Sequence, residues 1–207
     1  MRKLLKVCGM TDGENIREVE SLGIDLMGFI FYEKSPRCIH QLPDYLPQHA
    51  QRVGVFVDAD YETIKCQASA FGLTYVQLHG HETPSFCAQL QKDGLQVIKA
   101  FSMAEASDLE PTGIYHGTCD YFLFDTKTAT HGGSGQLFDW SVLAQYHGPT
   151  PFLLSGGIGL DSLEALHRFS HPALIGYDLN SRFESSPGMK DVARLKLFTL
   201  NINLIIY

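Results

Sequence analysis

Residues 52–79 have the sequence RVGVFVDADYETIKCQASAFGLTYVQLH. The runs Arg52–Val57 and Thr74–His79 are short and mostly apolar, which is typical of buried strands. Between them, Asp60 precedes the apolar residues Ile64 and Ala68, and a carboxylate directly before such spacing favours a capped helix. The stretch therefore predicts one complete strand–helix–strand unit with parallel strands.

The same pattern recurs from one end of the chain to the other. Continuous apolar runs, rather than alternating ones, fit strands that helices cover on both faces of a parallel sheet. The expected strands are Leu4–Gly9, Leu26–Phe31, Arg52–Val57, Thr74–His79, Gln96–Phe101, Tyr121–Asp125, Pro151–Ser155 and Ala173–Leu179.

Capping residues mark three further helix starts. Thr11 resembles the first residue of a capping box, because Glu14 follows three positions later. Thr83 followed by Pro84 fits an N-cap and a first helical position, and Asp161 precedes another apolar stripe. These signals place helices after the first, fourth and seventh expected strands.

Two other connecting segments are interrupted. Pro43 and Pro47 break up the segment after the second strand, and Pro111 and Gly113 break up the segment after the fifth. Helix formation is least favoured in these two places.

The number of units decides between two architectures. Eight units in 207 residues correspond to a repeat of about 26 residues, near the lower size limit of a (β/α)8 barrel. An open, doubly wound sheet has the same alternation of strands and helices. Eight regular units in so short a chain favour closure, so we expect a single (β/α)8 TIM-barrel domain over residues 1–207.

The overall charge narrows the classes of partner. The formal net charge is −7, whereas non-specific nucleic-acid binders depend on an excess of Lys and Arg. Attachment to a membrane through a basic face is disfavoured for the same reason, and no run of roughly 18 apolar residues predicts a membrane span. A small anionic ligand remains compatible, because a single site can be locally positive.

The cysteines indicate a reducing compartment. Their number is odd and none form a CxxC pair, which argues against a disulfide framework or an all-cysteine zinc site. The start of the chain lacks the basic and long apolar segments of a signal peptide. We therefore expect a cytoplasmic protein with reduced thiols at Cys8, Cys38, Cys66, Cys87 and Cys119.

Two ionisable residues stand at strand ends that a barrel would bring to its catalytic face. Cys8 ends the first strand, and its thiolate could act as a base or nucleophile; the alternative is a small buried apolar residue. Asp125 ends the sixth strand, where an apolar pocket would raise its pKa and let it donate a proton. The alternative for Asp125 is a carboxylate satisfied by loop amides.

Glycine-rich loops near the last strands suggest an anion site. Glycine lets backbone amides approach a phosphate, and the common phosphate site of this fold follows strands seven and eight. The alternative is ordinary turn glycine. The relevant stretches are Gly132-Gly133-Ser134-Gly135, Ser155-Gly156-Gly157-Ile158-Gly159 and Asn180-Ser181-Arg182.

Two other polar stretches follow strands. In Ser35-Pro36-Arg37, the arginine could contact a carboxylate with two hydrogen bonds, or it could be a solvated surface residue. His79 and His81 suggest a metal site, but no third ligand has suitable spacing, so a histidine at the rim of the barrel is favoured.

These pieces occur together, in this order, in one known family. The whole chain resembles the phosphoribosylanthranilate isomerases, and the combination is far more specific than any single piece. The matching stretches are Lys6-Val7-Cys8-Gly9, Gly28-Phe29-Ile30-Phe31, Ser35-Pro36-Arg37, Val53-Gly54-Val55-Phe56, Gln77-Leu78-His79-Gly80, Phe124-Asp125-Thr126, Gly132-Gly133-Ser134-Gly135, Phe138-Asp139-Trp140, Ser155-Gly156-Gly157-Ile158 and Pro187-Gly188-Met189-Lys190-Asp191.

The resemblance implies a reaction and its residues. It implies an Amadori rearrangement of N-(5-phosphoribosyl)anthranilate to 1-(2-carboxyphenylamino)-1-deoxy-D-ribulose 5-phosphate in tryptophan biosynthesis, without metal or cofactor. Asp125 matches the general acid, Cys8 the general base and Arg37 the residue near the anthranilate carboxylate. The expected partner is this small phosphosugar, and the protein is expected to be a monomer or a homodimer. The phosphate grip would come from Gly133, Gly156, Gly157, Ser181 and Arg182.

Some features leave alternatives open. The family often has Ser-Gly where this chain has Ser181-Arg182, and arginine would be strained if that position required a positive φ; its side chain could instead contact phosphate. Asp178 could touch a sugar hydroxyl or compete with Asp125 for the acid role. Two rival functions are a metal-dependent sugar-phosphate epimerase and a non-catalytic barrel that binds a phosphate ligand.

Overall fold

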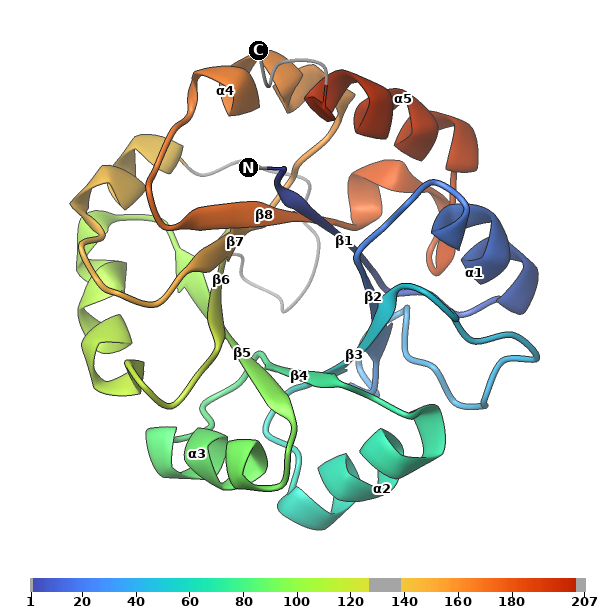
Figure 1. The fold of residues 1–207 in the computed structure, drawn as a ribbon, viewed down its shortest axis with the longest axis horizontal. Coiled ribbons are helices and arrows are strands. Elements are labelled where there is room, and N and C mark those ends of the chain that lie inside the picture. Colours follow the sequence, from blue (N-terminus) through green and yellow to red (C-terminus); the bar gives the residue numbers. More distant parts are fainter. Residues whose placement is uncertain (1, 127–138, 204–207) are drawn as a thin grey trace.

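The computed structural model describes residues 2–126 and 139–203, and these form a closed barrel of eight parallel strands (Figure 1). Neighbours in sequence are neighbours in the barrel, and β1 pairs with β8 to close it. The strands are β1 (Leu4–Cys8), β2 (Leu26–Ile30), β3 (Gln51–Phe56), β4 (Tyr75–Leu78), β5 (Gln96–Met103), β6 (Tyr121–Thr126), β7 (Phe152–Leu154) and β8 (Leu174–Leu179).

All eight expected strands are therefore confirmed, and the doubly wound alternative is excluded by the β1–β8 pairing. The register places Lys6 beside Asp178 and Cys8 beside Gly28, so residues far apart in sequence meet at one end of the barrel.

Apolar side chains hold the barrel together on both sides of the sheet. The side chains that point inward fill the barrel toward the amino-terminal ends of the strands, and a larger group packs between the strands and the surrounding helices. The inward group comprises Leu26, Val53, Tyr75, Ile98, Ala100, Leu123 and Leu153. Because this layer plugs the barrel, a ligand can enter only from the opposite, carboxyl-terminal end of the strands.

The surrounding helices lie outside the barrel in Figure 1. The α-helices are α1 (Gly13–Glu20), α2 (Tyr61–Phe71), α3 (Pro84–Lys92), α4 (Leu163–Arg168) and α5 (Val192–Asn203). Shorter 3-10 segments are η1 (Ala106–Tyr115), η2 (Trp140–Gln145), η3 (Leu160–Ser162) and η4 (Ser181–Phe183), and β9 (Glu184–Ser186) pairs with β10 (Met189–Lys190) after β8. No helix of the described residues is long and apolar enough to cross a membrane.

The caps explain where the helices begin. Asp60 and Thr83 cap α2 and α3 as expected, accepting hydrogen bonds from the amides of Thr63 and Phe86. The expectation for α1 is wrong by one residue, because the cap is Asp12.

Two side chains expected to start helices are engaged elsewhere. The Thr11 hydroxyl donates to the carbonyl of Gly188 in the β9–β10 turn at 3.0 Å. A 3-10 turn precedes α4, and the Asp161 carboxylate in that turn accepts from Arg182.

The two interrupted segments differ from a regular unit, as their prolines indicate. Residues 31–50, all described, contain no helix, and the segment after β5 is the 3-10 helix η1 with Pro111 inside it. The strands that each of these segments joins are nonetheless paired as parallel neighbours in the barrel.

Candidate active site

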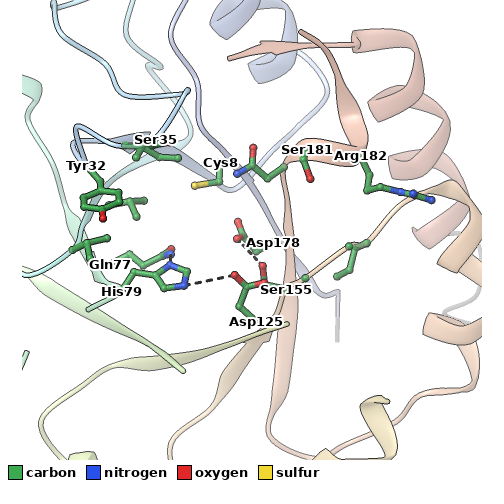
Figure 2. Close-up of a pocket in the computed structure, with 17 residues that line it drawn as sticks. Cys8, Tyr32, Ser35, Gln77, His79, Asp125, Ser155, Asp178, Ser181 and Arg182 are labelled. Carbon is green, nitrogen blue, oxygen red and sulfur yellow. Dashed lines mark hydrogen bonds and ion pairs between the residues drawn. The ribbon is translucent and has the colours of Figure 1, made fainter. Parts of the chain in front are cut away.

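A pocket opens at the carboxyl-terminal ends of the strands, and its walls come from seven of the eight strand–loop units (Figure 2). Polar side chains from β1, β4, β6 and β8 gather on its floor, while apolar residues of β2 and β3 line one side. The lining residues are Cys8, Ile30, Tyr32, Ser35, Val55, Val57, Gln77, His79, Asp125, Ser155, Gly156, Gly157, Ile158, Asp178, Asn180, Ser181 and Arg182.

Cys8 lies at the end of β1 with its thiol in this pocket. The neighbouring strand makes room for it, because a Cβ atom at Gly28 would lie 2.7 Å from the Cys8 sulfur. Burial raises the pKa of the thiol above its ordinary value, Lys6 and Lys190 oppose that rise, and Asp178 adds to it. Its placement in the pocket favours the role of a base over that of a small buried apolar residue.

Asp125 enters the pocket from β6 and lies across the pocket from Cys8 (Figure 2). Burial and then the charge of Asp178 raise the pKa of Asp125 to about 6, against opposing hydrogen bonds from the Thr126 amide and the Ser155 hydroxyl. A carboxyl group with this pKa can hold a proton near neutral pH and release it to a substrate oxygen.

Asp178 has a different environment on β8. Its Oδ1 accepts a hydrogen bond from the ammonium of Lys6 at 2.7 Å, and its Oδ2 accepts one from Ser155 at 3.1 Å. Lys6 is fully buried, so this ion pair is shielded from water. Both oxygens of Asp178 are thus engaged by Lys6 and Ser155, which favours Asp125 over Asp178 as the acid.

His79 lies at the rim beside Asp125. Its Nε2 is 3.6 Å from Asp125 Oδ2, and its Nδ1 is 3.2 Å from the side-chain nitrogen of Gln77. His81 points elsewhere, is 86% exposed and contacts Asp58. The two histidines do not converge, and the described part of the chain contains no group of three residues that could ligate a metal.

The loop after β7 is shaped by glycine. Gly156 and Gly157 have φ values of 85° and 68°, and a Cβ atom at Gly156 would lie 2.2 Å from the Thr126 hydroxyl. Only glycine is compatible with both the conformation and the space at position 156. Both glycines line the pocket next to Ser155, so their amides border the space that a ligand would occupy.

The loop after β8 supplies a neighbouring part of the wall through Ser181 and Arg182. Arg182 lies in η4 and does not have a positive φ, so the strain considered for this position is absent. Its guanidinium pairs with Asp161, while its buried Nε has no hydrogen-bond partner among the described residues. Gly133, also expected at the phosphate, lies outside the described residues.

Arg37 lies near the pocket but does not line it. Its side chain passes Gly9, where a Cβ atom would be 2.8 Å from Arg37 Cδ. Its Nε and Nη2 bond to both carboxylate oxygens of Glu184, at 2.7–2.9 Å. Arg37 is thus neither a solvated surface residue nor aimed into the pocket in this structure.

Several polar partners of these residues were not predicted from the sequence. Lys6 could have been found, because it precedes Cys8 by two positions on the same strand and so shares its face. Glu184 and Lys190 lie in or beside a matching stretch, but no property of that stretch identifies their partners. Gln77 was named only as part of its motif, and its buried Oε1 has no partner among the described residues.

Comparisons with known proteins agree with this geometry. Residues 5–201 match the family described as N-(5'phosphoribosyl)anthranilate (PRA) isomerase. The N-(5'-phosphoribosyl)anthranilate isomerase of Phocaeicola vulgatus is 51% identical over 195 residues, covering 94% of this chain and 95% of that protein. The enzyme of the same name from Parabacteroides distasonis is 49% identical over 205 residues, covering 96% of this chain and 93% of its own length.

Solved structures are similar over nearly the whole chain. The crystal structure of phosphoribosyl anthranilate isomerase from Thermotoga maritima has a TM-score of 0.85 and 34% identity, covering 97% of this chain and 98% of that one. A second structure from that organism, of monomers generated from the dimeric enzyme, has a TM-score of 0.81, 31% identity and the same coverage. A structure of the isomerase in complex with reduced 1-(o-carboxyphenylamino)-1-deoxyribulose 5-phosphate has those same values.

Proposed function

This chain belongs to the N-(5'-phosphoribosyl)anthranilate isomerase family and catalyses that isomerisation in tryptophan biosynthesis, and we propose that Asp125 is its general acid and Cys8 its general base. The observation that carries the assignment is their placement in one pocket, on β6 and β1, together with the raised pKa of Asp125. The two groups can therefore act on different parts of one bound sugar.

The proposed first step opens the ribose ring. Asp125 gives its proton to the ring oxygen, the bond from that oxygen to C1 breaks, and the anthranilate nitrogen forms a double bond to C1. The raised pKa of Asp125 supports this role, because a carboxyl that keeps its proton near neutral pH can act as an acid. His79 at 3.6 Å is placed to stabilise the carboxylate that remains.

The proposed second step removes hydrogen from C2. The Cys8 thiolate takes the proton, the electron pair forms a C1–C2 double bond, and the nitrogen regains its lone pair. The resulting enolamine becomes the ketone when C1 gains a proton and the C2 hydroxyl loses one. Over the two steps and the final tautomerisation, the substrate gains two protons, at the ring oxygen and C1, and loses two, from C2 and its hydroxyl. The Schiff base itself accepts the electrons, so the chemistry requires neither metal nor cofactor.

The phosphate is proposed to bind between the loops after β7 and β8. The amides of Gly156 and Gly157 would cradle it, with Ser181 and Arg182 on the other side and Gly133 contributing from the loop after β6. Binding energy from this remote group then orients the reacting carbons between Cys8 and Asp125.

Arg37 is proposed to contact the anthranilate carboxylate. Glu184 engages its Nε and Nη2, which fixes the plane of the guanidinium, and Nη1 is the nitrogen that a carboxylate would reach. An Arg37→Ala enzyme should show a higher KM for the anthranilate substrate with a smaller change in stability.

The turnover test uses freshly generated N-(5-phosphoribosyl)anthranilate in EDTA, followed by the loss of anthranilate-type fluorescence. Cys8→Ala and Asp125→Asn should each lower turnover by about 10²–10⁴-fold while circular dichroism shows that the fold survives. Near-normal turnover in both variants would refute the assignment, and activity that EDTA abolishes would favour the metal-dependent epimerase.

The assembly and the cellular compartment are also part of the proposal. Because a relative from Thermotoga maritima is dimeric, we propose a monomer or a homodimer, which light scattering after gel filtration would measure. A cytoplasmic location is proposed from the biosynthetic role and the expected reduced thiols.

A further inference from the structure

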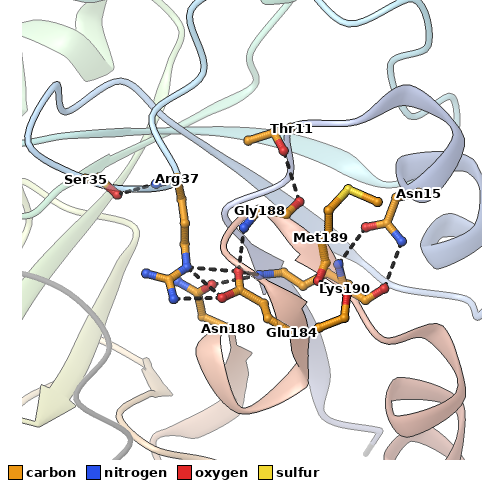
Figure 3. Close-up of polar contacts among 10 residues, drawn as sticks. Thr11, Asn15, Ser35, Arg37, Asn180, Glu184, Gly188, Met189 and Lys190 are labelled. Carbon is orange, nitrogen blue, oxygen red and sulfur yellow. Dashed lines mark hydrogen bonds and ion pairs between the residues drawn. The ribbon is translucent and has the colours of Figure 1, made fainter.

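The hairpin that follows β8 carries a buried lysine that the proposed mechanism does not use. Lys190 of β10 has no exposed side-chain surface, and Figure 3 shows its ammonium between Asn180 and Glu184. The distances are 2.7 Å to Asn180 Oδ1 and 2.6 Å to Glu184 Oε1. A buried ammonium is costly unless it has partners, so a fully buried lysine behind a catalytic pocket requires an explanation.

The backbone of Lys190 is fixed as firmly as its side chain. Asn15 of α1 accepts a hydrogen bond from the Lys190 amide at 2.8 Å and donates one to its carbonyl at 2.9 Å. Asn15 is itself buried. The ammonium is therefore held in one place by the first helix, the hairpin and the end of β8.

The counter-ion of Lys190 is shared with a second cation. Glu184 accepts from Lys190 through Oε1 and from Arg37 through both oxygens. Although burial raises the pKa of Glu184, hydrogen bonds from Arg37 and Lys190 hold it below its ordinary value, so it is ionised. One negative charge faces two positive charges here, and one positive charge is left uncompensated.

The groups that face Cys8 from other elements have no such excess. Lys6 on β1 is paired with Asp178 on β8, so these two charges largely cancel at the thiol. Asp125, which also lines the pocket, is the proposed acid and reacts in its neutral form. The uncompensated charge at Lys190 therefore adds to the positive charge that acts on Cys8, and a thiolate there would balance it.

We propose that Lys190 is a positioning residue for the reaction, whose buried ammonium, sharing Glu184 with Arg37, stabilises the thiolate of Cys8. The inference rests on the proposed role of Cys8 as base. Cys8 and Lys190 interact in both directions: Lys190 lowers the pKa of the thiol, and the thiolate raises the pKa of the ammonium, which burial otherwise lowers. Arg37 takes part through the carboxylate that it shares.

The test measures the titration of Cys8 without substrate. The rate at which iodoacetamide alkylates Cys8 is followed against pH, with mass spectrometry of the Cys8 peptide separating it from the other thiols. Lys190→Met should move the midpoint about one pH unit higher, because a positive charge that interacts with the thiolate is removed. Turnover at neutral pH should fall about 10-fold, as the thiolate fraction does.

A second variant and a control keep the test decisive. In Arg37→Met, Glu184 has Lys190 as its remaining cation and neutralises it, so the midpoint of Cys8 alkylation should also move to higher pH. This variant replaces Lys190→Met in the test if Lys190→Met does not fold. Lys65→Met makes the same change on α2, where Lys65 is partly exposed and far from the pocket, and should leave the midpoint in place. If Lys190→Met folds, an unchanged or lower midpoint overturns the proposal. If Lys190→Met does not fold, an unchanged midpoint in Arg37→Met overturns it.

This readout separates the two claims. A raised midpoint in Lys190→Met together with normal turnover of Cys8→Ala would uphold the coupling and refute the catalytic role of Cys8. A loss of turnover in Cys8→Ala with no shift in Lys190→Met would do the reverse.

Discussion

Two carboxyl groups at the same end of the barrel illustrate how single neighbours decide a role. Asp178 is paired with a buried lysine, whereas the contacts of Asp125 among the described residues include hydrogen bonds from Thr126 and Ser155 and a 3.6 Å contact with His79. The sequence showed both residues at strand ends but could not distinguish them, because the difference depends on Lys6, which β1 brings beside β8.

The pH dependence of kcat/KM should report Asp125. The acid must be protonated and Cys8 ionised, yet the thiol has the higher pKa, so lowering the pH below about 6 removes thiolate without adding protonated Asp125. We expect kcat/KM to fall below about pH 6, and Asp178→Asn to move this bend to lower pH, since the charge that raises the pKa of Asp125 is gone.

The phosphate of the substrate also titrates near this pH. The pKa of the substrate phosphate is the same for every enzyme variant. If the bend in the pH profile of kcat/KM stays at the same pH in Asp178→Asn, the fall in kcat/KM at low pH belongs to the substrate, which would contradict the role given to Asp125.

Arg182 gives a second prediction at this scale. Its guanidinium is held by Asp161 beside the proposed phosphate site, and a charge-assisted contact contributes roughly 1.5–3 kcal/mol. Arg182→Gly should therefore raise KM at least about 10-fold with little change in kcat, because the contact is made equally in ground and transition states. Arg168→Ala, which removes another arginine paired with an acid, is the matched control. An unchanged KM in Arg182→Gly would show that Arg182 does not contact the phosphate.

At the scale of elements, local signals predicted what local chemistry controls. The caps at Asp60 and Thr83 and the prolines of the interrupted segments acted within a few residues, and the structure confirms them. The start of α1 was misplaced because Thr11 bonds to Gly188, 177 positions away. A cap competes with such long-range partners, and a single sequence does not reveal them.

The loop after β4 depends on a buried ion pair. Glu82 accepts from Lys99 at 3.1 Å and from the amides of Asp58 and Gly80 at 2.9 and 3.0 Å, which ties the ends of β3 and β4 together behind His79. Lys99→Met would leave the Glu82 carboxylate buried without its cation and should cost about 3–5 kcal/mol of unfolding free energy.

Urea unfolding would measure this cost, with the m value checked for constancy. The double variant Glu82→Gln/Lys99→Met should recover part of it, because no charge is then left unpaired. A loss below about 1 kcal/mol in Lys99→Met would show that the pair does not stabilise the loop.

At the scale of the whole molecule, closure of the barrel brings the ends of the eight repeated strands together and so forms the site. The eight strands could be predicted because each is a local apolar run, and their number favoured a barrel. Closure brings Lys6 to Asp178 across 172 positions and Cys8 and Asp125 into one pocket. The residues of the site were thus predicted by position and resemblance, whereas the charges that tune them follow only from the closed structure.

The central claim is that Asp125 opens the ring before Cys8 removes the C2 hydrogen. Borohydride tests this order directly, because it reduces the Schiff base to a stable ring-opened amine. With N-(5-phosphoribosyl)anthranilate, Cys8→Ala should yield this amine well above the enzyme-free background, while Asp125→Asn should yield only the background. Equal trapping by the two variants, or more in Asp125→Asn, would contradict the assignment of acid and base.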